Sequence, residues 1–471
     1  MSSYTISNPT INTKRMFILQ KSEIEKRFDP EFYGHIFNKY EKQLIKKPFK
    51  KFNQILKSIN NGFDFREYKD FGTPYIKVAN IRKGEFRFDK MQYINFDSSE
   101  ISKNIQLKKG NLLLTRKGTF GYAIFLDKDY DYVISSEVFY IEIDQNHINS
   151  KFLEIFFNSK IGQAQFDKNK IGAIMGSLSQ DAIKELKIPT PSVDIQNKII
   201  EIYSIFNLQK QQNKLEAEKL LASIDTYLLN ELDITLPIQE ENTLKSRMFI
   251  KSFKEITSRR YDPNYFSQEF KILDNLFEKY ETIELGKVSI QISDAPHERP
   301  EFSENKEIRV IMIEHLKPEG IQKTKEKYIT AEYHLKLKST ILEMDDLLMA
   351  RIGVTTGVTS IVDDFFVGKN ISGNITLIRL NHSKICTNFV LEYLNSFLGR
   401  LYSKRILSNS ARDFLTVGKI KAMRIPVIPI AKQKEIATHI TQIRQEAQAL
   451  KDKTKIAFQK ANEEIEKLLL E

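Results

Sequence analysis

The sequence contains a single cysteine, Cys386, and no segment long enough to serve as a membrane span. One thiol cannot form an internal disulfide, a Cys-x-x-Cys pair or a thiolate metal cluster, so we interpret Cys386 as a structural residue. No run approaches the length of about 18 apolar residues that a bilayer requires, and the polar start at Met1 lacks the pattern of a signal peptide. We therefore expect a cytoplasmic protein with no membrane partner.

The motifs of nucleotide-processing enzymes and metalloenzymes are also missing. The sequence has no GxxxxGK[ST] phosphate loop, no GxGxxG turn between a strand and a helix, and no HExxH or Cys/His ligand spacing. Asp29-Pro and Asp262-Pro faintly resemble the Asp-Pro-Pro-Tyr motif of amino-methyltransferases, but each lacks the second proline and a glycine-rich cofactor loop. We interpret both as turn and helix-start signals, and we predict no catalytic residue, no metal site and no cofactor in this chain.

Acidic residues are fewer than basic ones. The 72 Lys and Arg residues exceed the 61 Asp and Glu residues, which gives a net charge of +11 and a pI near 9.2. This balance favours a polyanionic partner, with nucleic acid as the leading candidate. Because 41% of the 471 residues are hydrophobic, the chain can bury a sizeable core.

The chain repeats a series of motifs in the same order, at a spacing that drifts only from 232 to 237 residues. The repeated pairs are Arg15-Met-Phe-Ile with Arg247-Met-Phe-Ile, Asp29-Pro with Asp262-Pro, Arg116-Lys-Gly with Arg351-Ile-Gly, and Ile188-Pro with Ile425-Pro. A period of this length predicts two domain-sized copies of one fold, because the units of a solenoid are much shorter.

Each copy is predicted to be a compact α/β (α+β) unit. Short apolar or alternating runs, separated by glycine and charged turns, predict strands at Asn111–Thr115 and Glu137–Ile143, and again at Asp346–Ala350 and Asn374–Leu380. We predict four parts: an N-terminal segment with the first globular domain, a long helix, the second globular domain and a C-terminal helix. Their boundaries are 1–190, 191–240, 241–427 and 428–471.

The two helices are predicted from missing helix breakers and from apolar periodicity. No glycine occurs from Ser177 to Leu285, and apolar residues recur there at three- and four-residue steps. The same steps occur in the C-terminal stretch, so we predict that the helices pair antiparallel as a spacer; the alternative is that each lies on its own domain. The Gln196–Glu231 helix would be roughly 54 Å long, which corresponds to at most about 16 base pairs of duplex.

Taken together and in order, these motifs resemble the specificity subunit of type I restriction-modification systems. The matching segments are the strand-and-turn segments Gly110–Gly121 and Asp346–Gly357, together with the Ile-Pro junction that leads into Gln196. The residue before the junction glutamine, usually Glu in that family, is Ile195 here and Lys432 in the second copy. The second proline of the junction is also displaced in the second copy. Both departures concern a helix entrance rather than recognition.

The resemblance implies two target-recognition domains separated by two long antiparallel helices, with an internal pseudo-twofold duplication. It implies a non-catalytic subunit that reads a bipartite, asymmetric site in double-stranded DNA. The implied partners are two methyltransferase (M) subunits and, in the full complex, restriction (R) subunits, which would use S-adenosylmethionine, ATP and Mg²⁺. Two alternatives stay open: a non-catalytic protein-interaction scaffold, and a standalone DNA nuclease or methyltransferase.

Candidate DNA-contacting residues are polar or cationic and lie at the glycine turns, at positions that differ between the copies, or in a loop that the family likeness places near DNA. They are Lys77, Asn80, Arg82, Arg116, Lys117, Thr119, Ser177, Ser179, Gln180, His315, Lys317, Arg351, Thr355, Thr356, Ser410 and Arg412. For the two turn arginines, Arg116 and Arg351, the alternative is an ion pair with a carboxylate that holds the turn. Because the two domains should read different sequences, residues that differ between the copies are the better candidates for specificity.

Overall fold

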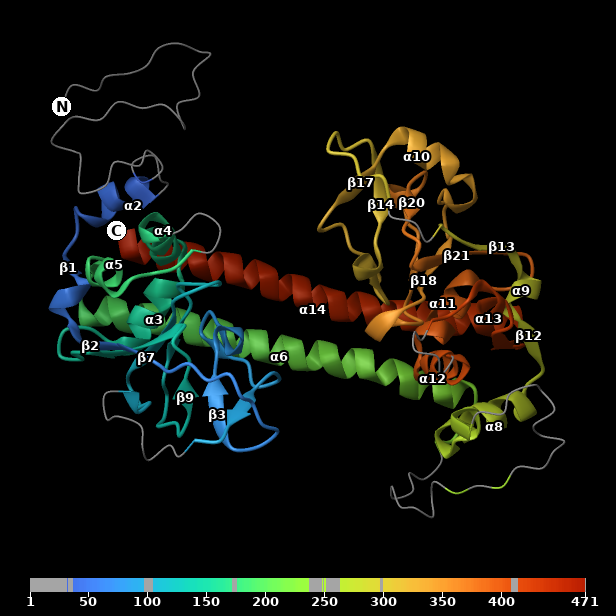
Figure 1. Cartoon of the computed structure of the whole chain (residues 1–471), viewed down its shortest axis with the longest axis horizontal. Coiled ribbons are helices and arrows are strands. Elements are labelled where there is room, and N and C mark those ends of the chain that lie inside the picture. The colour runs from blue at the N-terminus through green and yellow to red at the C-terminus, as the bar shows by residue number, and fades with distance from the viewer. Residues whose placement is uncertain are drawn as a thin grey trace, which may run out of the picture. The chain divides into compact units, whose positions relative to one another are not determined.

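The computed structural model describes residues 32, 37–96, 105–171, 176–236, 248, 250, 263–296, 300–407 and 414–470. The chain divides into two compact units (Figure 1): unit 1 comprises residues 1–212 and 453–471, and unit 2 comprises residues 213–452. The repeated motifs that begin at Arg15 and Asp29 lie outside the described residues, and of those that begin at Arg247 and Asp262 only Met248, Ile250 and Pro263 are described.

Unit 1 is built on an antiparallel four-stranded sheet, to which a three-stranded sheet and two strand pairs are added. The large sheet has the order β2 (Leu56–Asn61), β10 (Val138–Ile143), β7 (Leu112–Thr115), β8 (Ala123–Phe125). The smaller sheet has the order β6 (Gln92–Ile94), β3 (Thr73–Ile76), β9 (Val133–Ile134), and the pairs are β1 (Phe49–Lys51) with β11 (Lys187–Pro189) and β4 (Ile81–Arg82) with β5 (Glu85–Phe86). The helices are α2 (Phe37–Leu44), α3 (Ser150–Asn158), α4 (Lys160–Asn169) and α5 (Gln180–Lys184).

Unit 2 repeats this topology strand by strand. Its large sheet has the order β13 (Ser289–Asp294), β21 (Ile375–Leu380), β18 (Leu347–Ala350), β19 (Thr359–Ile361), and its smaller sheet the order β17 (Lys327–Ile329), β14 (Ile308–Ile311), β20 (Asn370–Ile371). The pairs are β12 (Thr282–Glu284) with β22 (Arg424–Pro426) and β15 (Leu316–Lys317) with β16 (Gly320–Ile321). The helices are α8 (Lys271–Lys279), α9 (Leu285–Val288), α10 (Ala331–Lys336), α11 (Thr387–Asn395), α12 (Phe397–Ile406) and α13 (Val417–Lys421). The predicted duplication and mixed α/β fold are confirmed.

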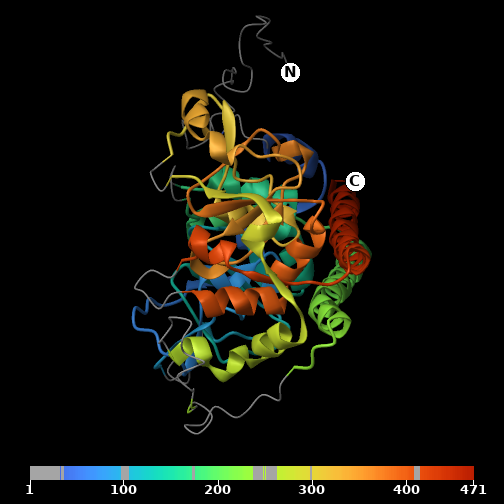
Figure 2. The same ribbon diagram turned by 90° about the vertical axis from the view of Figure 1, so that its right-hand side faces the viewer.

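The central strands are apolar on both faces because each of them separates two cores. Along β18, Leu347 and Met349 belong to a core cluster that includes residues of α11 and α12, whereas Leu348 and Ala350 belong to a different cluster. Figure 2 shows the orange helices of unit 2 beside its strands. Side chains alternate between the faces of a strand, so a run of four buried residues fills two cores. The run in β7 is divided in the same way, with Leu113 in one cluster and its two neighbours in another.

The two long helices, α6 (Val193–Glu231) and α14 (Ile430–Leu470), contribute residues to both units (Figure 1). In unit 1 the first part of α6 meets the last part of α14, where the rings of Phe206 and Phe458 lie 5.4 Å apart. In unit 2 the end of α6 meets the start of α14, where the rings of Tyr227 and His439 lie 4.2 Å apart. The helices are therefore antiparallel, as predicted.

Both helices also close the core of a globular domain. Ile199 of α6 and Ile465 of α14 are fully buried in a cluster with the strands of unit 1. Ile436 and Ile440 of α14 take the corresponding place in unit 2. Each helix therefore contacts the other helix and also packs on a domain, so the structure contains both the predicted pairing and its alternative. Among the described residues, no helix combines the length and the apolar character that a bilayer crossing requires.

The glutamine at each junction fixes a long helix to its domain. Gln196 is 5% exposed; its Oε1 accepts from the Asn149 backbone N–H at 2.9 Å, and its Nε2 donates to the Pro191 carbonyl at 3.0 Å. Gln433 makes the same two bonds, accepting from the Cys386 N–H at 3.0 Å and donating to the Ile428 carbonyl at 2.9 Å. The repeated Ile-Pro and Gln motif therefore encodes an anchor.

The departure from the family at Lys432 also has a physical role. Its ammonium group lies 2.5 Å from the Glu231 carboxylate at the end of α6. A glutamate at position 432 would face that carboxylate with a like charge, so lysine favours the helix pair in unit 2.

Candidate nucleic-acid interface

In unit 1 the glycine turn between β7 and β8 is open to solvent. Gly118 and Gly121 adopt φ values of +68° and +80°, which favour glycine. The Gly121 N–H donates to the Thr115 carbonyl at 2.8 Å and closes the turn. A Cβ at Gly118 would meet no atom within 4 Å, and both Lys117 and Thr119 are exposed. A ligand can therefore approach this backbone closely.

This turn docks on the segment that precedes α5. The Arg116 carbonyl accepts from the Leu178 N–H at 3.0 Å, and the Arg116 Nε donates to the Leu178 carbonyl at 3.4 Å. Lys117 forms an antiparallel bridge with Ser177. Six of the predicted residues thus come together in one cluster, which we call the unit 1 turn cluster: Arg116, Lys117, Thr119, Ser177, Ser179 and Gln180.

Two members of the unit 1 turn cluster are engaged in the local structure. Ser179 is the N-cap of α5 and accepts from the Ala182 N–H at 3.1 Å. Gln180 donates to the Asn61 side chain at the end of β2, at 3.2 Å. The cluster therefore combines exposed residues of the turn with side chains that hold the turn in place.

Unit 2 has the same turn between β18 and β19. The Gly357 N–H donates to the Ala350 carbonyl at 2.8 Å. Arg351 repeats both contacts of its counterpart, since its carbonyl accepts from the Leu415 N–H at 3.0 Å and its Nε donates to the Leu415 carbonyl at 2.8 Å. Thr355 and Thr356 lie on this turn, and the Thr356 hydroxyl donates to the Gly353 carbonyl at 2.7 Å. The predicted residues Ser410 and Arg412 lie outside the described residues.

The two turn arginines differ in their surroundings. Arg351 is 3% exposed and forms an ion pair with Asp294 at the end of β13. Arg116 is only half-buried. Arg351 therefore follows the alternative interpretation: a carboxylate partner holds it in the turn.

Asn80 and His315 occupy corresponding places at the ends of the short 3-10 turns Val78–Asn80 and Ile313–His315. Both are buried, at 1% and 4% exposure. The Asn80 side chain accepts from the Lys77 N–H at 2.9 Å, and His315 Nδ1 accepts from the Met312 N–H at 3.1 Å. Each side chain holds its own backbone here, so contact with DNA would require these bonds to break. Burial also lowers the pKa of His315.

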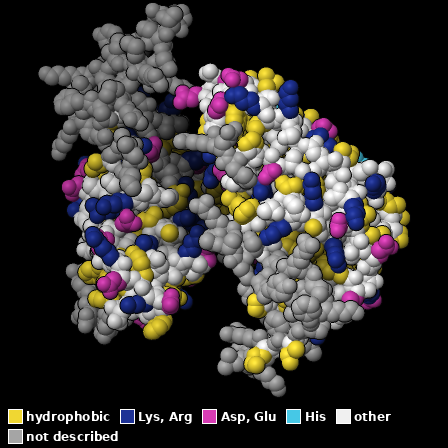
Figure 3. Space-filling view, turned by 45° about the vertical axis from the view of Figure 1, so that its right-hand side comes forward, with side chains coloured by type: hydrophobic (Ala, Val, Ile, Leu, Met, Phe, Trp, Pro, Cys, Tyr) yellow, Lys and Arg dark blue, Asp and Glu magenta, His cyan; other side chains and the backbone are white. Residues whose placement is uncertain are grey.

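Three further predicted residues remain cations without a carboxylate partner in the described part of the chain. The Lys77 ammonium group lies 3.1 Å from the Tyr68 hydroxyl and 3.3 Å from the Gln92 amide oxygen. Arg82 donates to the Ile81 carbonyl at 2.8 Å, and Lys317 holds Ser360 through backbone bonds alone. On the face in Figure 3, basic side chains are scattered among acidic ones. The charge available to DNA is therefore distributed over separate cations.

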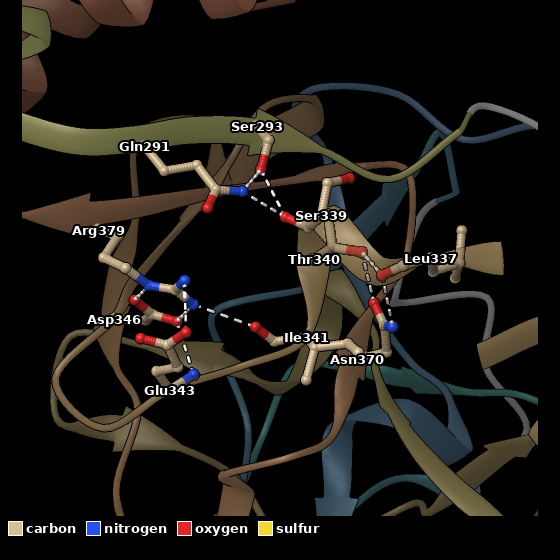
Figure 4. Close-up of polar contacts among 10 residues, drawn as sticks. All are labelled: Gln291, Ser293, Leu337, Ser339, Thr340, Ile341, Glu343, Asp346, Asn370 and Arg379. Atoms are coloured by element: carbon tan, nitrogen blue, oxygen red, sulfur yellow. Dashed lines mark hydrogen bonds and ion pairs between the residues drawn. The ribbon is translucent and has the colours of Figure 1, made fainter. Parts of the chain in front are cut away.

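Other polar networks differ between the units, although the backbone is shared. In unit 2, Arg379 on β21 donates two 2.8 Å hydrogen bonds to Asp346, and its ion pair with Glu343 measures 2.7 Å (Figure 4). The hydrogen bonding of Asp346 raises the pKa of Arg379. At the corresponding place on β10, unit 1 has Glu142, which accepts from the Ser58 hydroxyl at 2.9 Å. These networks stabilise each unit internally.

Sequence reasoning missed one cation at the unit 2 turn. Arg400 of α12 is half-buried, and its Cδ lies 3.9 Å from the position that a Cβ at Gly357 would take. A helix arginine outside any motif gives no signal of its own. Only its correspondence with Gln163 of α4 could have pointed to it.

No group of three or more His, Cys, Asp or Glu side chains suited to a metal occurs among the described residues.

Comparisons with known proteins agree on one family. Residues 45–226 match the family described as Type I restriction modification DNA specificity domain. The chain is 21% identical over 463 residues to the putative type I restriction enzyme MjaX specificity subunit of Methanocaldococcus jannaschii, covering 97% of this chain and 98% of that protein.

Two solved structures are also similar. The type I restriction-modification S subunit from M. genitalium is 14% identical, with a TM-score of 0.44 over 89% of this chain and 95% of that one. A chain from a structure concerned with complex assembly and conformational transition of the type I R-M system is 13% identical, with a TM-score of 0.49 over 90% and 96% of the two chains. From the family match and the full-length relative, the chain is similar over almost its whole length to the type I restriction-modification specificity subunits.

Proposed function

We propose that this chain reads a bipartite, asymmetric site in double-stranded DNA, with one part of the site read by each unit. The observation that carries the proposal is that two units share one topology but carry different polar side chains at corresponding positions. A shared backbone presents its turns to a ligand in the same way, whereas different side chains select different bases. The net charge of +11 supports binding to the phosphate backbone.

The same proposal gives the chain an assembly role. It would position two methyltransferase (M) subunits, and in the full complex restriction (R) subunits; S-adenosylmethionine, ATP and Mg²⁺ would be bound by those partners. Exposed apolar side chains on α6 support docking of a protein, since Ile205 is 61% exposed and Leu208 is 57% exposed. They also fit a scaffold that binds no DNA, which is the second candidate.

A domain exchange tests the reading of DNA. Residues 30–190 would be replaced by the equivalent domain of a relative, and the methylated sites would be mapped by sequencing of genomic DNA. We expect one half of the target to change and the other to remain. Loss of both half-sites would contradict independent reading by the two units.

Affinity purification of the chain from its native cells tests the assembly role. We expect an S-adenosylmethionine-dependent methyltransferase to co-purify at about two copies per chain. A folded and abundant chain that brings down no methyltransferase would contradict this role. Binding to duplex DNA that is absent or insensitive to salt would favour the scaffold, since phosphate-driven affinity falls steeply with salt.

A further inference from the structure

We propose that each unit contacts a DNA phosphate through one arginine at its glycine turn, and that this arginine comes from a different element in each unit. In unit 1 it is Arg116 of the turn itself, and in unit 2 it is Arg400 of α12. Arg351, the sequence counterpart of Arg116, instead holds its turn. This inference rests on the proposed function and identifies the residues that contact the DNA phosphate backbone.

Arg116 has donors that the structure does not use. Its Nε donates to the Leu178 carbonyl, and its guanidinium carbon lies 5.5 Å from the centre of the Phe139 ring. Among the described residues, no carboxylate lies within ion-pair distance of it. A guanidinium has five N–H donors, so most of them remain for an anion. A planar fork of this kind suits the oxygens of a phosphate.

The residue at the end of an edge strand determines whether the turn arginine forms an ion pair. Asn61 of β2 pairs with Phe139 of β10, and Asp294 of β13 pairs with Thr376 of β21, so the two occupy the same register position. Asp294 captures Arg351 in an ion pair, whereas the neutral Asn61 accepts from Gln180. Because Asn61 is neutral and Asp294 is charged, Arg116 keeps donors for a ligand whereas Arg351 is held in an ion pair.

The helix that packs against the turn also differs between the units: α4 of unit 1 has a neutral glutamine where α12 of unit 2 has an arginine. In unit 1, Gln163 of α4 donates to the Gly121 carbonyl at 2.7 Å and to the Phe157 carbonyl at 2.8 Å, so its amide is used. Arg400 takes this place in unit 2, one residue after Gly399, as Gln163 follows Gly162. Its side chain makes no hydrogen bond or ion pair with any described residue.

The surroundings of Arg400 favour an anion. No carboxylate in the described part of the chain lies within ion-pair distance of Arg400, and partial burial lowers the pKa of its guanidinium. The buried Ser403 hydroxyl, one turn further along α12, lies 2.7 Å from the Cβ position of Gly357, so α12 packs directly against the glycine turn. A phosphate at this turn would accept from the Arg400 guanidinium.

Salt titration of DNA binding tests the assignment. The full chain would be titrated with a fluorescently labelled duplex of random sequence over a series of NaCl concentrations. We expect Arg116→Gln and Arg400→Gln each to reduce the slope of log K against log salt by about 0.9, the value for one lost phosphate contact. Matched controls remove a cation that already has a carboxylate partner: Lys108→Gln, paired with Asp129 at 3.1 Å, and Lys404→Gln, paired with Glu269 at 2.5 Å on the same helix as Arg400.

A second variant keeps Arg116 but gives it a carboxylate partner. Asn61→Asp would place at the unit 1 turn the carboxylate that Arg351 has, so we expect the same loss of slope as in Arg116→Gln. The control is Asn60→Asp, which adds the same charge on the opposite face of β2 and should leave the slope unchanged.

The outcomes separate this inference from the proposed function. If the wild-type chain binds with a salt-dependent affinity but both arginine variants behave like their controls, the assignment is overturned and the DNA-binding function stands. If the wild-type chain shows no salt-dependent binding to duplex DNA, both are overturned.

Discussion

The junction glutamines give the sharpest prediction about stability, because a single side chain anchors a long helix to each domain. In Gln433→Ala, the Cys386 N–H and the Ile428 carbonyl both lose their partner at a site where the glutamine is 5% exposed. An unsatisfied buried polar group costs about 1–3 kcal/mol, so two of them should cost about 2–4 kcal/mol after partial relaxation. We expect unit 2 to lose this stability and unit 1 to keep its own.

Hydrogen exchange followed by mass spectrometry can measure this loss, because it reports stability separately for each segment. A loss of about 2 kcal/mol corresponds to roughly 30-fold faster exchange. We expect at least this change in peptides from α11, and no change in those from α3. Gln196→Ala should give the reverse pattern. Gln445→Ala is the matched control, since Gln445 is an exposed glutamine on the same helix.

The anchor role would be refuted if exchange in α11 were no faster in Gln433→Ala than in Gln445→Ala. It would also be refuted if both units lost protection equally, because the two hydrogen bonds lie entirely within unit 2. An exposed substitution such as Gln445→Ala should change stability by less than about 0.5 kcal/mol.

Two further predictions concern unit 2. Arg444→Ala should lower the free energy of unfolding, followed by thermal melting, by about 3–5 kcal/mol, because it leaves the buried Glu392 carboxylate without its 2.9 and 2.6 Å hydrogen bonds. Lys432→Ala breaks a more exposed pair and should cost clearly less, so equal losses would contradict this. Because burial lowers the pKa of His315, the unfolded chain binds more protons below about pH 6.5, so stability should be complete above that pH and fall as the pH drops towards the folded pKa. His315→Asn, which installs the residue that unit 1 has at Asn80, should flatten this pH dependence of the melting temperature, and an unchanged slope would show that another group is responsible.

The fold could be predicted because its signals are local and occur twice. The strand at Asp346–Ala350 was predicted from a short apolar run, and the structure begins β18 at Leu347. The helix at Gln196–Glu231 was predicted from the absence of breakers and from its periodicity, and α6 begins at Val193. Hydrophobic periodicity fixes which face of an element is buried, so neighbouring residues suffice to recognise it.

The candidate site was predictable only in part. The glycine turns were found from their motifs, and the structure brings Arg116, Lys117 and Ser177 together there. Asn80 and His315 differ between the copies, which predicts a role in specificity, yet they make the same kind of capping bond. A difference in residue type does not show whether a side chain is exposed, because that depends on packing by distant segments.

The sequence by itself determined the duplication, the two long helices and the places of the glycine turns, since each of these follows from a pattern within a short stretch of chain. Only the tertiary structure decided what the turn arginines do. Arg116 and Arg351 occupy the same place in the same motif, but the presence of an ion pair depends on whether Asn61 or Asp294 ends a strand more than fifty positions earlier. A charge interaction is set by distance in space, and only folding brings those residues together.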